Sequence, residues 1–236
     1  MKKTSISANS ENSISTYRRL RLAIGWLGVL LPIILVSLSL IPAFKTSIQG
    51  SISHYYYTNL REIFTGILCA VGLFLIRYNG HTNPNLLKND RLLTNIAGAM
   101  AFGVAFFPTN PIEVTDKIYS LIPSTSPWLG WLHYFFAGTL FLILATISIN
   151  VFTIGQHRND DIPISLWNEN HIYRGCGYFM LLFILMIPIC DFFGLSYTTL
   201  VFEGLALIAF GISWLIKGRV MGDKGQIGQS LYREQN

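Results

Sequence analysis

The sequence predicts an all-α membrane protein, a six-helix transmembrane bundle with both termini in the cytoplasm. Of its 236 residues, 51% are hydrophobic and only 12% are charged, about half the charged share of a soluble domain. The hydrophobic residues also lie in long continuous blocks, which argues against a membrane β-barrel with its alternating pattern. These observations exclude a soluble enzyme domain, a disulfide scaffold and a disordered chain.

Six blocks approach the roughly 20 apolar residues that a helix needs to cross hydrocarbon. The predicted helices cover residues 22–43, 60–77, 92–107, 128–152, 175–195 and 198–216. Residues 1–20 are rich in Ser and Asn and lack a secretory signal, so we expect a disordered cytoplasmic tail there. Residues 21–217 then form one transmembrane domain, and residues 218–236 form a second cytoplasmic tail.

Small residues predict which faces of the second and third helices pack inward. Glu62, Gly66 and Ala70 follow one another at four-residue spacing, which allows close helix contact. This spacing predicts that the start of the second helix, with Arg61 and Glu62, points to the centre of the bundle. A stripe of alanines makes the third helix a close-packed central element: Ala97, Ala101 and Ala105.

The basic residues predict the orientation. With the N-terminus inside, all but three of the 17 Lys and Arg residues fall on the cytoplasmic side, the exceptions being Lys45, Arg61 and Lys117. This distribution predicts a multi-pass protein of the plasma or bacterial inner membrane. It also accounts for the net charge of +5 without a nucleic-acid partner, since no basic stripe with interleaved aromatic residues is present.

Ionisable residues within the predicted helices gather toward the outer face. Glu62 opens the second helix, His133 lies early in the fourth, Asp191 lies late in the fifth and Glu203 lies early in the sixth. Charged groups inside a membrane are costly unless they are paired or hydrated. We therefore expect these four residues and Arg61 to form one outward-facing polar pocket that binds or remodels a membrane lipid or another amphiphile.

Residues 51–58 precede the second helix and carry hydroxyl groups, an imidazole and three tyrosines. The expected role is to cover the pocket, with Ser53, His54 and Tyr56 as ligand-binding residues beside Arg61 and Glu62. The tyrosines also fit an interfacial belt at the membrane surface. If the pocket is catalytic, Glu203 or Asp191 is the general base and His133 carries the proton.

Other interpretations of the same residues stay open. In one alternative, Arg61, Glu62, Glu203 and His133 form a structural salt-bridge network that catalyses no reaction. No cofactor is expected, although His54, His133, Asp191 and Glu203 together have the donor types of a zinc site. A serine hydrolase requires a serine beside His133 with an acid behind it, for which Ser53 is the candidate.

A transporter or a purely structural membrane protein are the alternatives from other functional classes. Pro32 in the first helix and Pro188 in the fifth are places where a transporter helix is expected to break. The oligomeric state does not follow from the pattern.

Short motifs along the chain resemble a six-span family of membrane proteins. They are Ser51-Ile52-Ser53, Leu60-Arg61-Glu62-Ile63-Phe64, Arg77-Tyr78, Asn95 with Gly98, His133 and Glu203. Over residues 22–216 this order resembles the DRAM/FRAG/SFK-type family, which includes the autophagy modulator DRAM and the factor that remodels the lipid of GPI anchors. The resemblance implies six helices, cytosolic termini and a role in lipid or membrane homeostasis. Where those relatives carry an acidic residue and Thr-Gly-Thr, this chain has His54 and three tyrosines.

Overall fold

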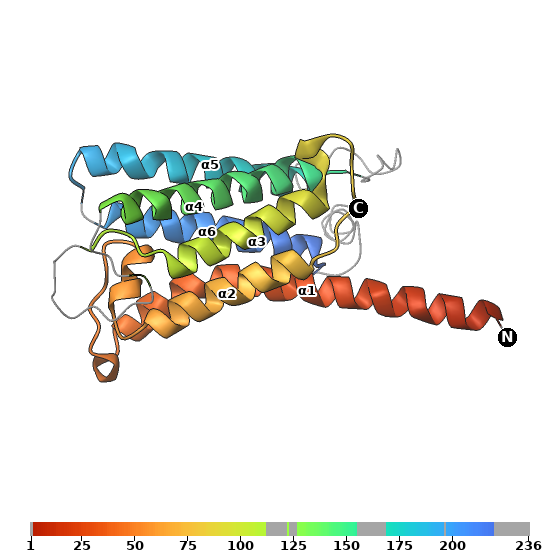
Figure 1. The fold of residues 1–236 in the computed structure, drawn as a ribbon, viewed down its shortest axis with the longest axis horizontal. Coiled ribbons are helices and arrows are strands. Elements are labelled where there is room, and N and C mark those ends of the chain that lie inside the picture. Colours follow the sequence, from red (N-terminus) through yellow and green to blue (C-terminus); the bar gives the residue numbers. More distant parts are fainter. Residues whose placement is uncertain (1, 112–121, 123–126, 155–168, 196, 220–236) are drawn as a thin grey trace, which may run out of the picture.

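The computed structural model describes residues 2–111, 122, 127–154, 169–195 and 197–219, and all regular elements in these ranges are helical (Figure 1). The α-helices are α1 (Lys2–Ser39), α2 (Arg61–Arg77), α3 (Asp90–Phe106), α4 (Pro127–Thr146), α5 (Glu169–Phe192) and α6 (Thr198–Lys217). The predicted all-α class is confirmed, and one helix corresponds to each of the six apolar blocks.

Four segments are long and apolar enough to cross a membrane: Ser15–Ser39, Trp128–Val151, Glu169–Phe192 and Thr198–Lys217. The second of these includes a π-helical turn, Ile147–Val151, that continues α4. Helices α2 and α3 have 17 residues each, or about 26 Å of helix. The four long apolar helices agree with the predicted membrane location.

Two features of the long helices differ from the sequence-based picture. Helix α1 begins at Lys2, within the segment expected to be disordered, and Figure 1 shows its first turns extending away from the other helices. Pro32 and Pro188 both lie inside continuous helices, so neither helix breaks as the transporter interpretation required. The C-terminal tail beyond Arg219 lies outside the described residues.

The six helices form a ring. Each helix packs against the next one along the chain, and α6 closes the ring by packing against α1. The predicted alanine stripe of α3 is confirmed as a packing face, because the side chains of Ala97, Ala101 and Ala105 are completely buried.

Glycines allow α1 and α6 to approach backbone to backbone. A Cβ atom on Gly211 would lie 2.6 Å from the carbonyl oxygen of Gly25 and 2.5 Å from the Cγ2 of Val29. A Cβ atom on Gly25 would lie 2.8 Å from the backbone nitrogen of Leu215. Neither position has room for a side chain, so this contact depends on both glycines.

The contact between α2 and α3 uses a different face of α2 from the one predicted. A Cβ atom on Gly98 would lie 2.7 Å from the carbonyl oxygen of Gly72. Gly66, by contrast, is exposed and has no atom within 4 Å of its Cβ position, and Glu62 is also exposed. The predicted inward stripe of Glu62 and Gly66 is therefore wrong, because α2 meets α3 through the glycine nearer its C-terminal end.

An aromatic cluster lies at the end of the ring where α2 and α6 finish. Trp214 is completely buried, and its ring centroid is 5.1 Å from that of Phe152 and 5.3 Å from that of Tyr78. Beside it, the hydroxyl of Ser148 donates to Ser213 at 2.8 Å between two buried side chains. These contacts fix the ends of α2, α4 and α6 relative to one another.

Candidate functional sites at the two ends of the bundle

Residues 51–58 are held against the bundle by polar residues from two helices. The carboxylate of Glu203 in α6 accepts the backbone N–H of Ile52 at 2.6 Å and also bonds the N–H of Ser53. From α4, His133 reaches the same turn, with its Nε2 2.9 Å from the Ser53 hydroxyl. Ser53, His133 and Glu203, predicted as parts of one site, therefore converge on a single helical turn, Ser53–Tyr57.

The surroundings of His133 fix its tautomer. Its Nδ1 lies 2.6 Å from the carbonyl oxygen of Phe107, which can only accept a hydrogen bond, so Nδ1 carries the proton. In the neutral ring Nε2 is then an acceptor, and the Ser53 hydroxyl donates to it. The serine expected beside His133 is present, but a backbone carbonyl occupies the position behind the histidine where a hydrolase triad has an acid.

A second serine–histidine pair lies in the same segment. His54 Nδ1 is 2.6 Å from the Ser51 hydroxyl, and His54 Nε2 is 3.2 Å from the carbonyl oxygen of Asn110. Burial lowers the pKa of His54, and the hydrogen bond to Asn110 partly opposes this effect. His54 is therefore neutral at neutral pH and links the segment to the chain after α3.

The tyrosines of the segment pack inside the protein. Tyr55 and Tyr56 are buried, so these two do not form the interfacial belt that their position suggested. The ring of Tyr56 lies under the guanidinium group of Arg61 at 5.4 Å, and the hydroxyl of Tyr57 donates to the carbonyl of Thr109. Tyr56 and Arg61, both predicted to bind ligand, thus contact each other.

Two predicted site residues are not brought into this cluster. Glu62 and Asp191 have exposed side chains. Adjacent positions on a helix point in directions about 100° apart, so Glu62 turns away when Arg61 faces Tyr56. Within the described ranges, no three His, Cys, Asp or Glu residues lie close enough to hold a metal ion.

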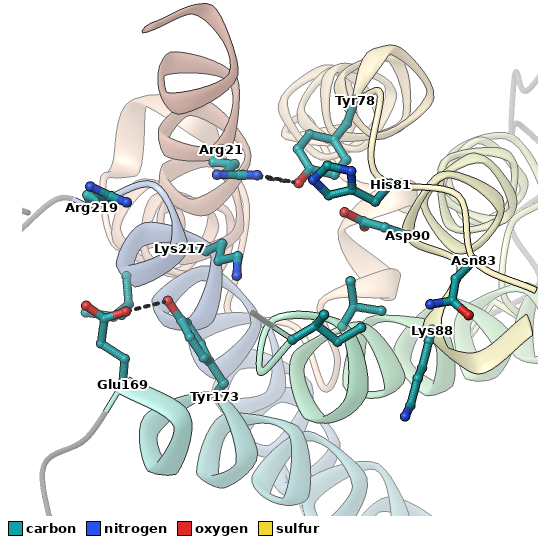
Figure 2. Close-up of a pocket in the computed structure, with 13 residues that line it drawn as sticks. Arg21, Tyr78, His81, Asn83, Lys88, Asp90, Glu169, Tyr173, Lys217 and Arg219 are labelled. Carbon is teal, nitrogen blue, oxygen red and sulfur yellow. Dashed lines mark hydrogen bonds between the residues drawn. The ribbon is translucent and has the colours of Figure 1, made fainter. Parts of the chain in front are cut away.

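The cavity of interest lies at the other end of the ring, where α1, α2 and α6 carry Arg21, Arg77 and Lys217. We call this the basic end. The cavity holds about 300 Å³ (Figure 2). Its polar lining comprises Arg21, Tyr78, His81, Asn83, Lys88, Asp90, Glu169, Tyr173, Lys217 and Arg219. Four lysine and arginine side chains thus face two carboxylates.

Lys217 projects from the end of α6 toward the interior of the cavity, whereas Lys88 lies at its rim (Figure 2). The ammonium group of Lys217 donates to the carbonyl of Phe152 at 2.8 Å and lies over the rings of Phe152 and Tyr173. These contacts hold one positive charge in a defined position on the cavity wall.

Arg21, Tyr78 and Asp90 lie together on the opposite wall. The guanidinium group of Arg21 donates to the Tyr78 hydroxyl at 2.7 Å. Burial, followed by the charge of Asp90, raises the pKa of Tyr78 to about 12. Tyr78 therefore keeps its proton at neutral pH.

Asp90 is buried, and one of its oxygens, Oδ1, has no hydrogen-bond partner among the described residues. Burial raises the pKa of this carboxyl, while Tyr78 and the charge of Arg21 oppose the shift. Gly80 leaves room for this group, since a Cβ atom at that position would lie 2.4 Å from the Asp90 carboxyl carbon. Asp90 is thus held in a position that costs free energy.

No pattern in the sequence predicted this cavity. The basic residues indicated only the orientation of the chain, and Asp90 lies just before the predicted third helix. A usable signal was present, because α1 and α2 run in opposite directions and so bring Arg21 and Tyr78 to the same end. The same alternation brings Asp90, Tyr173 and Lys217 there.

Comparisons with known proteins add no relative: no protein-family model, no curated protein and no solved structure matches the chain. The functions proposed below therefore rest on geometry and chemistry alone.

Proposed function

We propose that this chain is a six-span membrane protein that binds the anionic headgroup of a membrane amphiphile in the cavity at its basic end. That end and both termini face the cytoplasm, as the distribution of lysine and arginine favours. The observation that carries the proposal is a polar cavity at the ends of apolar helices, lined by four lysine and arginine side chains against two carboxylates.

The size of the cavity supports a headgroup as its occupant. A volume of about 300 Å³ is at the lower limit of small-molecule pockets. It suits a phosphate with a small substituent, while the acyl chains of the same molecule stay in hydrocarbon beside the helices. Lysine and arginine also gain from contact with anionic lipid, by about 1 kcal/mol for each charge near the membrane surface.

The proposed ligand is an amphiphile, as the sequence predicted, but the proposed site lies at the opposite end of the bundle from residues 51–58. Around residues 51–58, Ser53 bonds His133, His54 bonds Ser51 and Tyr56 stacks on Arg61. The hydrogen-bonding and charged groups of these side chains are therefore already in contact with one another. At the basic end, by contrast, charged groups surround a space.

Replacing Lys217 by glutamine tests the proposal, because it removes the positive charge that projects into the cavity. We expect the variant to retain about fivefold less anionic phospholipid during purification, since one lost contact of about 1 kcal/mol changes an affinity by that factor. Native mass spectrometry of the full chain measures the retained lipid, and circular dichroism checks folding.

Arg77→Gln is the matched control, because Arg77 is an exposed cation at the end of α2 that does not line the cavity. It should leave lipid retention unchanged. If both variants lose lipid equally, the basic end attracts lipid only as a charged surface and the cavity has no special role. If neither variant loses lipid, the proposed lipid-binding function is wrong, and a structural role without lipid binding replaces it.

A second candidate function follows from the Ser53–His133 pair. The Phe107 carbonyl holds His133 in the tautomer whose Nε2 accepts the Ser53 proton, as in a serine nucleophile activated by its base. In this candidate Ser53 Oγ attacks an ester carbonyl, and its proton passes through Nε2 to the departing alcohol. Water then releases the acyl group from Ser53.

A membrane-impermeant fluorophosphonate added to intact cells tests this candidate and the proposed orientation together. The probe transfers its phosphonyl group to an activated serine and releases fluoride. We expect an adduct on Ser53 in the native chain and in Ser51→Ala, and none in Ser53→Ala. If the native chain gives an adduct only after the cells are opened, the proposed orientation is wrong, and if it gives none at all, Ser53 is not a nucleophile.

A further inference from the structure

The buried Oδ1 atom of Asp90 requires an explanation. Native proteins leave few buried polar atoms without a partner, because an unpaired buried polar atom lowers stability. Asp90 is 5% exposed and lines the cavity, and no described group bonds Oδ1. Figure 2 shows its carboxylate pointing into the space between Arg21, His81 and Lys217. A molecule bound in that space therefore lies beside the Asp90 carboxyl group.

The charges near Asp90 decide which kind of donor suits Oδ1. The positive charges of Arg21 and Lys217 already act on the carboxyl group. An ammonium group on the ligand would meet those cations at close range, and like charges repel strongly where water is limited. A neutral hydroxyl group donates a hydrogen bond without this cost.

We infer that the headgroup bound in the cavity carries a free hydroxyl beside its phosphate, and that this hydroxyl donates to Oδ1 of Asp90, as in a phosphoglycerol headgroup. The inference rests on the proposed function and names the ligand class of the same site. Lys217 contacts the phosphate in this arrangement. Asp90 is thus a specificity residue, and the lysines and arginines supply affinity.

Two lipids of equal charge, one with hydroxyl groups on its headgroup and one without, provide the test. The full chain is reconstituted in phosphatidylcholine nanodiscs, and phosphatidylglycerol is compared with phosphatidylmethanol, which has the same charge and no hydroxyl. Affinity is measured from the thermal stabilisation over a series of lipid concentrations. We expect phosphatidylglycerol to bind about tenfold more tightly, since a hydrogen bond to a charged group contributes about that factor.

Variants separate the hydroxyl contact from general charge attraction. Asp90→Ala should bind the two lipids equally. Asp90→Asn keeps the shape of the side chain and covers the case in which the alanine variant does not fold; it should reduce the preference to about threefold, because a hydrogen bond to an uncharged acceptor is about half as strong. Gly80→Ala displaces the carboxylate without changing a cavity charge, and it should also reduce the preference. Lys88→Gln at the rim should weaken both lipids alike.

The preference should also depend on pH. Because burial raises the pKa of Asp90, its carboxyl becomes protonated at a higher pH than an ordinary aspartate. As the pH falls through this value, phosphatidylmethanol should bind more tightly, since a negative charge leaves the cavity, while the preference for phosphatidylglycerol should shrink. The groups that act on this carboxyl are Tyr78, Arg21, Lys217 and His81, so the measurement is repeated with His81→Gln.

Each outcome is decisive. Equal binding of the two lipids by the native chain overturns the hydroxyl contact and leaves the proposed function intact. Absence of saturable binding by either lipid overturns the proposed function itself. The soluble compounds sn-glycerol 3-phosphate and methyl phosphate show whether the ligand is a lipid headgroup or a free phosphate ester. If the native chain prefers the glycerol compound in this pair but shows no preference between the two lipids, the hydroxyl contact is made by a soluble ligand.

Discussion

Replacing Gly211 by valine should cause the largest loss of stability of any single change considered for this bundle. The Cβ atom alone would lie 2.6 Å from the carbonyl oxygen of Gly25, a backbone atom that moves only if α1 and α6 separate. Overpacking of this kind costs about 1 to 3 kcal/mol when side chains can adjust, and more when they cannot. We expect little or no monodisperse protein after purification.

Gly138→Val is the control for this prediction. It makes the same exchange within α4, where no atom lies within 4 Å of the Cβ position. Thermal melting and size-exclusion chromatography of both variants in the same detergent give the comparison. A Gly211→Val variant as stable as Gly138→Val would contradict the close contact of α1 with α6.

Replacing His133 by alanine should have the second-largest effect, at the other end of the bundle. The change removes both ring hydrogen bonds, leaves the Phe107 carbonyl and the Ser53 hydroxyl without these partners, and opens a small cavity. We expect a loss of about 3 kcal/mol, or roughly 6 to 12 °C in melting temperature for a chain of this size. The released segment should also become accessible to protease at Lys45, which precedes it.

His54→Ala serves as the comparison, because His54 belongs to the same segment, is less buried than His133 and links the segment to the carbonyl of Asn110. Its effect on melting temperature should be about half that of His133→Ala, and cleavage after Lys45 should increase less. Equal effects of the two variants would show that the segment is not anchored mainly through α4.

The helices were predictable because a membrane imposes a simple rule on composition. A helix satisfies its backbone hydrogen bonds in hydrocarbon, and it needs a long run of apolar side chains there. Such runs are easily found in the sequence, and the ends of α2, α3 and α6 lie within two residues of the predicted blocks. The start of α1 was not predictable in this way, since Ser- and Asn-rich residues carry no apolar signal. The π-helical turn that extends α4 also has no sequence signature.

The candidate sites were predictable only in part. The position of a residue along its helix follows from the sequence, whereas the direction in which its side chain points depends on how the neighbouring helices pack. Ser53, His133 and Glu203 share a depth and also meet. Asp191 was expected at the depth of Glu203 but has an exposed side chain. The role of Asp90 depends on packing against Tyr78 and Gly80, which no local pattern encodes.

The closure of the ring has a consequence for how the protein is made. Helix α1 is synthesised before α6, which is the partner of its Gly25 face. Until α6 has been made, that face therefore lacks its final neighbour. A chain interrupted after α5 would leave the close-packed glycine face of α1 uncovered.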